Sequence, residues 1–257
     1  MARLPKSAGV LFSLVLAGCS PSDQGVRPAG ETRATALQAG YGIPPMPTDL
    51  KTDTQGLVVS GRAAPKARVR LATPDGDARF SSADETGTWH LRLPAASEAR
   101  LFGLSSVLGA QTVQAQGYLL VTPAGQGTLL RAGAGAHRFG PGRSGILAVD
   151  FDREGGALVS GIAGAGEGLT LRVDGRQPVE GRAGADGRFS MAMSQPISPG
   201  PHEVRVFGNR ADWRESFDAT PAAPVADGPF RVQPIARGLR VDWMPPGGGV
   251  QTTILLD

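Results

Sequence analysis

Residues 58–94 read VVSGRAAPKARVRLATPDGDARFSSADETGTWHLRLP, and much of this stretch returns one hundred residues later. The second copy, residues 158–194, reads LVSGIAGAGEGLTLRVDGRQPVEGRAGADGRFSMAMS. The matching positions are a Val-Ser-Gly triplet, apolar residues spaced two apart and a turn glycine: Val59, Ser60, Gly61, Val69, Leu71, Gly87, Trp89 and Leu91 in the first copy, and Val159, Ser160, Gly161, Leu169, Leu171, Gly187, Phe189 and Met191 in the second. Strand interiors and a turn therefore recur, without any shared reactive side chain. The duplication indicates an architecture and leaves the chemistry open.

Apolar and polar residues alternate within each copy. In residues 68–71 and 89–93 every second side chain is apolar, as expected for antiparallel strands with one buried and one solvated face. Pro74-Asp75-Gly76 and Thr86-Gly87 supply turn residues between such strands. Further segments of this kind are 100–107, 112–122, 128–132, 169–173, 189–193 and 204–206. Short strands separated by turns about every eight to twelve residues predict an all-β fold of two tandem antiparallel β-sandwiches.

The composition fits this expectation and argues against one class of partner. The 257 residues include 37 Gly and 21 Pro, while 40% hydrophobic residues suffice for a core. The formal net charge of +3 becomes nearly zero if Arg3 and Lys6 are removed with a leader, which leaves 24 basic and 23 acidic residues. No run of Lys or Arg follows, so nucleic acid is not expected as a partner.

The N-terminus predicts export. Arg3 and Lys6 precede an apolar stretch, residues 9–16, that is too short to span a bilayer. The stretch ends in Leu16-Ala17-Gly18-Cys19, which resembles the lipobox of bacterial lipoproteins. The resemblance implies a signal peptide over residues 1–18, cleavage before Cys19 and acylation of its thiol. A plain secretory signal with an incidental cysteine is the alternative.

Acylation of Cys19 would attach the chain to a membrane. Several acyl chains, at about 0.8 kcal/mol per buried methylene, would make the anchor effectively permanent. Ser20 stands where an Asp would resemble the inner-membrane retention signal, so the resemblance implies the outer membrane. Whether the body faces the periplasm or the cell surface stays open.

Residues 20–55, which follow the lipidated Cys19, are expected to form a flexible tether. They are polar, contain several prolines and show no sustained periodicity. The alternative is a short strand or helix around residues 32–37 that docks on the body. The first sandwich is then expected over residues 56–142, and the second over residues 143–257 with a C-terminal hairpin.

The first copy resembles bacterial Ig-like domains of cell-surface and envelope proteins. The resemblance rests on the pattern G-x-A-x-P-x-A-x-V-x-L over residues 61–71, then Asp75-Gly76, then G-x-W-x-L-x-L-P over residues 87–94. Two positions depart from the pattern. Lys66 replaces a usual glycine, and Gly117-Tyr118 occurs where the family typically closes with a T-V-x-V-x-A-x-D strand. The resemblance implies Ig-like sandwiches.

Two features outside the duplicated stretch concern how the units join. Residues 131–144, RAGAGAHRFGPGRS, predict a flexible joint, and no Gly-Lys-Ser/Thr follows that would make it a phosphate-binding P-loop. Val149-Asp150-Phe151 and Val241-Asp242-Trp243 echo each other, and we expect hairpins over 147–159 and 239–256. The first hairpin could belong to either unit or to both.

Asp150, Asp152 and Glu154 are the best candidate metal ligands, because carboxylates at alternate positions before Gly155 mimic half of a calcium loop. The bidentate Glu of such a loop would fall at position 161, which is Gly161. The favoured interpretation is therefore no metal site, with a strand whose acids face solvent and whose apolar residues Leu147, Val149 and Phe151 face inward.

No catalytic residue or cofactor is expected. His90, His137 and His202 lack the close spacing of a zinc site and are expected to be solvated. No Gly-x-Ser-x-Gly nucleophile motif is present. Trp213 is a weak candidate for stacking on a glycan, with packing in the core or a loop as the favoured alternative.

These observations predict a non-enzymatic, envelope-anchored lipoprotein that scaffolds or binds another envelope protein. The alternative is a module that binds glycan or peptidoglycan. Exposed strand edges that accept a partner strand are a further possibility. Since the outward residues differ between the two copies, we expect the specific function in the loops, the joint or the terminal hairpin.

Overall fold

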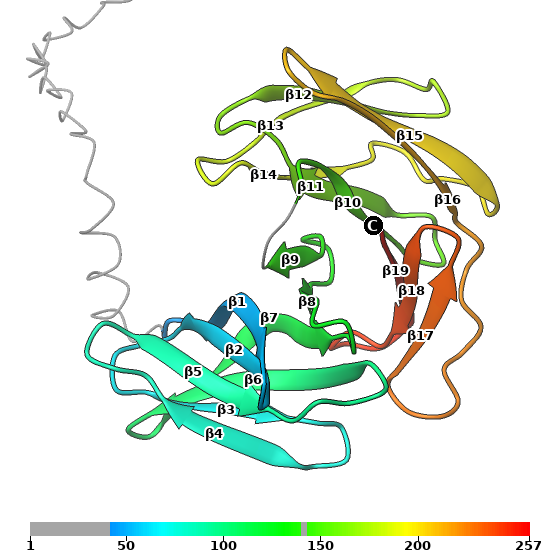
Figure 1. Cartoon of the computed structure of the whole chain (residues 1–257). Coiled ribbons are helices and arrows are strands. Elements are labelled where there is room, and N and C mark those ends of the chain that lie inside the picture. The colour runs from blue at the N-terminus through cyan, green and yellow to red at the C-terminus, as the bar shows by residue number, and fades with distance from the viewer. Residues whose placement is uncertain (1–41, 140–142) are drawn as a thin grey trace, which may run out of the picture. The chain divides into compact units, whose positions relative to one another are not determined.

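The computed structural model describes residues 42–139 and 143–257, and every regular element in these ranges is a β-strand. The strands form four sheets in which all pairings are antiparallel (Figure 1). The predicted all-β, antiparallel fold class is confirmed. The predicted leader, the lipobox with Cys19 and the possible element at 32–37 lie outside the described residues.

Two sheets enclose the first core. Sheet A has the order β1 (Met46–Asp53), β2 (Gly56–Arg62), β5 (Thr88–Leu93). Sheet B has the order β4 (Ala78–Ser82), β3 (Arg68–Ala72), β6 (Arg100–Leu108), β7 (Gln111–Val121), β8 (Gly127–Leu130), β9 (His137–Phe139). The side chains between them include Val59, Val69, Leu71, Trp89 and Leu119, all fully buried.

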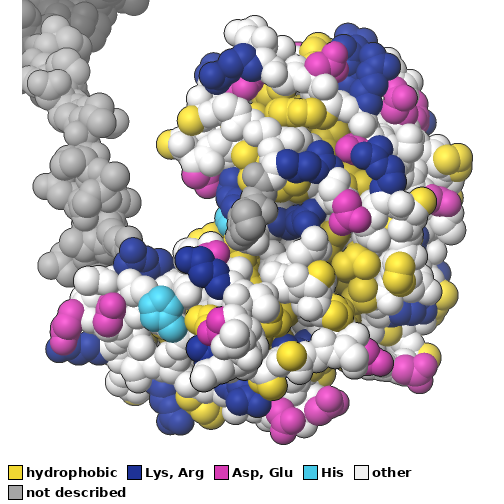
Figure 2. Space-filling model, viewed as in Figure 1, with side chains coloured by type: hydrophobic (Ala, Val, Ile, Leu, Met, Phe, Trp, Pro, Cys, Tyr) yellow, Lys and Arg dark blue, Asp and Glu magenta, His cyan; other side chains and the backbone are white. Residues whose placement is uncertain are grey.

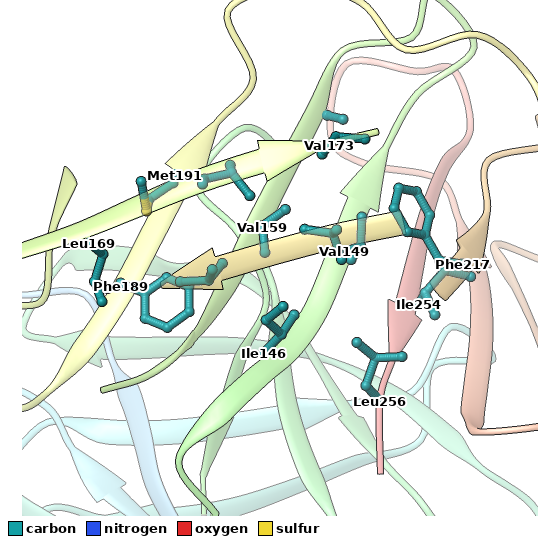
Figure 3. Packing of buried hydrophobic residues seen from close by; sticks show 14 of the residues in the cluster. Ile146, Val149, Val159, Leu169, Val173, Phe189, Met191, Phe217, Ile254 and Leu256 are labelled. Carbon is teal, nitrogen blue, oxygen red and sulfur yellow. The ribbon is translucent and has the colours of Figure 1, made fainter. Parts of the chain in front are cut away.

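Two further sheets enclose the second core. Sheet C has the order β14 (Arg188–Ala192), β11 (Ala157–Ile162), β10 (Gly145–Phe151), β19 (Gln251–Leu255), β18 (Gly238–Trp243), β17 (Phe230–Ile235). Sheet D has the order β13 (Val179–Arg182), β12 (Gly168–Val173), β15 (Pro201–Gly208), β16 (Asp212–Asp218). Figure 3 shows Val149, Val159, Leu169 and Phe217 converging in this core.

The duplicated stretch gives the same strand pairing twice. Gly61 of β2 pairs with Trp89 of β5, and Gly161 of β11 pairs with Phe189 of β14. A methyl group on Gly61 would lie 2.3 Å from the Trp89 ring, and one on Gly161 would lie 2.6 Å from the Phe189 ring. The glycine in each copy therefore makes room for the aromatic ring opposite it, which explains why both positions recur.

The tether expected through residue 55 was wrong for residues 46–53, which form β1 at the edge of sheet A. This strand carries few apolar side chains, and its alternation is interrupted where the register shifts between Pro47 and Asp49. Only Pro47 and Leu50 are buried. The strand is held mainly by backbone pairing with β2, which a hydrophobic pattern does not report.

The expected hairpins exist as β10–β11 and β18–β19. Strand β10 pairs with β11 on one side and with β19 on the other, so the first hairpin belongs to sheet C of the second sandwich. The terminal strand β19 is central in that sheet, because it also pairs with β18.

The turn glycine of each copy is expected to be sensitive to substitution. Gly87 has a φ of 82°, and a methyl group there would lie 2.4 Å from the Ala63 carbonyl oxygen. Gly187 has a φ of 78° and a 2.6 Å approach to Ala163. Gly87→Ala should therefore lower the free energy of unfolding by more than the roughly 1–2 kcal/mol that a positive φ alone costs a non-glycine residue.

Gly76→Ala is the matched control for this prediction. Gly76 has a φ of 97° but nothing within 4 Å of the added methyl group. Urea unfolding of the three variants should rank Gly87→Ala and Gly187→Ala as similar, and both as more destabilising than Gly76→Ala. Equal losses for all three would show that the contact with the carbonyl does not matter.

Candidate functional site

The two sandwiches meet through the outer faces of sheets B and C. Residues 41–257 cluster as one compact unit, and a third hydrophobic cluster lies between these sheets. We call this cluster the junction; its buried members are Leu101, Leu120, Leu130, Ala136, Ala148, Val241, Trp243 and Leu255. In sheet B, Leu119 faces the first core while its neighbour Leu120 faces the junction. The central strands of sheet B are thus apolar on both faces.

Trp243 is the largest side chain in the junction and is fully buried. The ring of Tyr118 meets it edge to face, with centroids 6.0 Å apart and an interplanar angle of 87°. The indole N–H donates a hydrogen bond of 3.1 Å to Thr253 Oγ1. A buried indole with a satisfied donor packs in one orientation, so Trp243 positions β18 against β7.

Asp150 lies in the same junction and is 2% exposed. Its Oδ1 accepts a hydrogen bond from Thr253 Oγ1 at 2.5 Å, and its Oδ2 accepts one from the backbone N–H of Ala136 at 2.9 Å. Burial raises the pKa of this carboxyl to about 6, although the hydrogen bonds from Thr253 and Ala136 and the charge of Arg131 oppose the shift.

The expectation that Asp150 faces solvent was wrong. Alternation along β10 does turn Val149 and Phe151 into the second core and Asp150 to the opposite face. That opposite face is covered by sheet B, however, so both faces of β10 are buried. Leu147 is buried outside the core that holds Val149, because the register of β10 shifts between Ile146 and Ala148.

The start of the predicted flexible joint is held in place by the second sandwich. Ser160 Oγ donates to the Ala136 carbonyl, and Ser190 Oγ donates to the Ala134 carbonyl, each at 3.0 Å. Arg131 donates to the carbonyls of Gly135 and Ala134 at 2.9 and 3.1 Å. The expectation of a flexible segment was wrong for residues 131–139. Serine side chains of sheet C donate hydrogen bonds to backbone carbonyls of this glycine-rich segment and so hold it in place.

Asp150, Asp152 and Glu154 are not brought together as a metal site. Asp152 ends the strand in a tight turn, where its Oδ1 accepts a hydrogen bond from the Gly156 N–H at 2.9 Å. Within residues 42–139 and 143–257, no group of three or more His, Cys, Asp or Glu side chains is placed to hold a metal ion.

A groove runs along the junction. One cavity of about 390 Å³ is lined by β7, Tyr118 and Trp243, and a second of about 580 Å³ shares Ala132 with it. A third, of about 250 Å³, shares Gly133 and Gln251 with the second. We call these three the junction groove; its walls are the joint at residues 132–135, the β10–β11 turn, the segment after β16, the β18–β19 turn and the middle of β7.

Strand β7 is irregular where it lines this groove. Gly103 pairs with Tyr118 and Ser105 pairs with Gln114, so residues 115–117 face a single residue of β6. A methyl group on Gly117 would lie 2.0 Å from the carbonyl oxygen of Leu130. Gly117-Tyr118 is also where the sequence departs from the Ig-like pattern. The departure therefore coincides with a bulge, a feature that commonly redirects side chains beside functional sites.

The three histidines have different environments. His90 is exposed, as expected for a side chain that points outward, and its Nδ1 lies 2.8 Å from Ser60 Oγ. The expectation of solvated histidines was wrong for the other two. His202 is 6% exposed, with Nδ1 2.6 Å from Asp174 Oδ2, and His137 is half-buried in β9. Burial, followed by the charges of Arg188 and Arg131, lowers the pKa of His137 to about 4.

Trp213 packs against the second core. Its ring stacks on Phe189 with centroids 6.4 Å apart and an interplanar angle of 6°, and the residue is partly buried. Of the two interpretations of Trp213, packing in the core or a loop is the one that fits this position. Sequence reasoning missed Tyr118, Trp243 and Thr253, although the Val-Asp-aromatic echo and the Gly117-Tyr118 departure mark the strands that carry them.

No protein-family model and no curated protein matches the chain. It is similar to a solved structure titled "Biofilm associated protein - BSP domain", with 13% identity and a TM-score of 0.23 over 70% of this chain and 30% of that chain. It is also similar to the "Central Fibronectin-III array of RIM-binding protein", with 14% identity and a TM-score of 0.27 over 83% of this chain and 90% of that chain. The chain thus spans under a third of the first structure's length. The β-sandwich fold follows from the chain's own four antiparallel sheets.

No helix within the described ranges is long and apolar enough to cross a membrane.

Proposed function

We propose that this protein is a non-enzymatic lipoprotein of the bacterial outer membrane, anchored by an acylated Cys19, that binds another envelope protein. Its two sandwiches act as one binding body. The lipobox and the tether position this body near the membrane, and the junction groove is the surface that contacts the partner.

The observation that carries the proposal is the junction groove. Its walls come from both sandwiches, and they include the joint, the terminal hairpin and the bulged β7. Concave surfaces at the interface between domains are a preferred position for binding sites. The groove exists only while sheets B and C stay packed, which would explain why the tandem units are fused through an apolar junction.

A second candidate function, glycan binding, is favoured by the lining of one cavity. The cavity of about 390 Å³ combines a partly exposed Tyr118 with the amides of Gln114 and Gln116. An aromatic face with nearby amide donors and acceptors suits a sugar ring, whose faces are apolar and whose rim carries hydroxyl groups.

Crosslinking in intact envelopes, with Cys19 retained, tests the proposal. Gln116→Arg places a large cation in the groove on an exposed side chain and should leave folding unchanged. Gln177→Arg, an equally exposed change on the loop between β12 and β13, is the matched control. We expect one stoichiometric protein partner with the wild type and the control, and its loss with Gln116→Arg.

The alternative outcomes separate the two candidates. Retention on purified sacculi that Gln116→Arg abolishes, without a protein crosslink, would favour the glycan function. A protein partner that both variants retain equally would place the binding surface elsewhere. Processing that globomycin does not inhibit would independently contradict the acylation of Cys19.

A further inference from the structure

Three arginines and a histidine line a small cavity beside the junction. Arg131 follows β8, His137 and Arg138 lie on β9, and Arg188 begins β14, so both sandwiches contribute. The cavity has a volume of about 110 Å³, and all four residues are half-buried. Figure 2 shows Lys and Arg side chains spread over the viewed face, several of them in its middle.

Two of the three arginines of this cavity, Arg131 and Arg138, are not neutralised by a close carboxylate among the described residues. Arg131 donates to the carbonyls of Ala134 and Gly135, and Arg138 donates to the carbonyl of Leu256. These bonds are made to neutral acceptors, so they leave the charges uncompensated. Among the described residues, no carboxylate lies within 4 Å of either guanidinium.

The surrounding carboxylates interact with the cluster only weakly or from a distance. Asp186 Oδ2 is 3.8 Å from Arg188 Nε, and the Asp186 side chain is 65% exposed. Asp150 attracts Arg131 but already accepts hydrogen bonds from Thr253 and Ala136. Asp257, at the end of the chain, attracts Arg138.

The electrostatics of the cluster favour a bound anion. Burial lowers the pKa of each of Arg131, Arg138 and Arg188, and the charge of Arg131 lowers that of Arg188 further. An arginine nevertheless stays protonated in proteins, so the repulsion persists at neutral pH. His137, with a pKa of about 4, is neutral there and can donate one ring N–H.

We propose that this cavity binds one phosphate group, presented either as inorganic phosphate or as the phosphoester of a lipid headgroup. Guanidinium groups match phosphate oxygens in geometry and form charge-assisted hydrogen bonds to them. A volume of about 110 Å³ accommodates one tetrahedral oxyanion. The site differs from the junction groove and does not depend on an acylated Cys19.

Calorimetric titration of the whole purified chain with inorganic phosphate, at constant ionic strength set with chloride, tests the site. We expect saturable binding that Arg188→Gln weakens at least tenfold, because the variant lacks one of the guanidinium groups that hold the anion. Among the described residues the side chain of Arg188 is paired only with the exposed Asp186, so folding should tolerate the change. Arg172→Gln, the same charge change at an exposed position on β12, is the control and should bind as the wild type does. Arg138→Gln should repeat the loss seen with Arg188→Gln.

NMR titration of His137 gives a second, local readout. The charges that now act on this ring are those of Arg188, Arg131 and the opposing Asp186. A bound phosphate favours the protonated ring, so the pKa of His137 should rise by at least one unit when phosphate is present. Arg188→Gln should remove the effect of phosphate on this pKa.

The source of the phosphate group is distinguished with vesicles. If phosphatidylglycerol vesicles compete with inorganic phosphate in an Arg188-dependent manner, the natural ligand is a lipid headgroup. If only soluble phosphate acts, the site serves a free phosphate or a small phosphoester. Absence of phosphate binding in the wild type, or equal weakening by Arg172→Gln and Arg188→Gln, would overturn the proposal.

Discussion

Trp243→Ala is expected to lower the free energy of unfolding by about 3–5 kcal/mol, the usual loss when a buried aromatic side chain is truncated in a core. Trp243 is fully buried in the junction and contacts Tyr118 of the other sandwich. Its removal leaves a cavity between sheets B and C and takes away the donor to Thr253. Urea unfolding followed by far-UV circular dichroism measures the loss.

Trp243→Phe separates the packing from the hydrogen bond. Phenylalanine keeps most of the ring contact but lacks the indole N–H, so the loss should be nearer the 1 kcal/mol or so that one net hydrogen bond contributes. The alanine variant should also unfold less cooperatively, because the sandwiches keep their own cores around Trp89 and Phe189. A loss under about 1 kcal/mol for Trp243→Ala would show that the junction contributes little stability.

The pH dependence of stability should contain a contribution from Asp150. The folded-state pKa, about 6, is raised above the usual value of 3.8, so between these pH values the folded chain keeps a proton that the unfolded chain has lost. Stability from this group is therefore fully present below pH 4 and is lost as the pH rises through 6. The shift of about two units corresponds to about 3 kcal/mol.

Asp150→Asn isolates this contribution. An asparagine can accept from the Ala136 N–H and place its amide N–H towards Thr253 Oγ1, the atom that donates to Asp150 in the wild type, and it does not titrate. As the pH rises from 4 to 7, the wild type should lose about 3 kcal/mol of unfolding free energy relative to the variant. If the unfolding free energies of the two proteins changed in parallel over this pH range, a raised pKa for the buried Asp150 would be contradicted.

The duplicated stretch was predictable because its strands have one apolar and one polar face. Alternation at 68–71 and 89–93 identifies β3 and β5 directly, and the one-hundred-residue repeat identifies β12 and β14. Strands β4 and β13 escaped because they are sheet edges with hardly any buried side chains, so their sequences carry no alternation. Strand β1 escaped for the same reason.

The junction was hidden for a different physical reason. Strands β8 and β10 are buried on both faces, so their sequences show no alternation of apolar and polar residues. A continuous buried strand in a sequence does not say what covers its second face. The carboxyl of Asp150 looked solvated for this reason, and the two walls of the junction groove could not be assigned to one site.

The arginine cavity was equally invisible in the sequence. Arg131 and Arg138 lie in a glycine-rich segment, and Arg188 lies about fifty residues further along the chain. No run of basic residues connects them. The fold brings β9 and the start of β14 to one cavity. The serine bonds from Ser160 and Ser190 that fix this segment likewise depend on the junction.

Differential scanning calorimetry of the whole chain tests the central claim, that the two sandwiches form one body through the packing of sheets B and C. We expect a single transition for the described body, with a calorimetric enthalpy equal to the van't Hoff enthalpy. Two resolved transitions in the wild type, or a calorimetric enthalpy about twice the van't Hoff value, would show that the sandwiches unfold independently and would contradict a fused binding body.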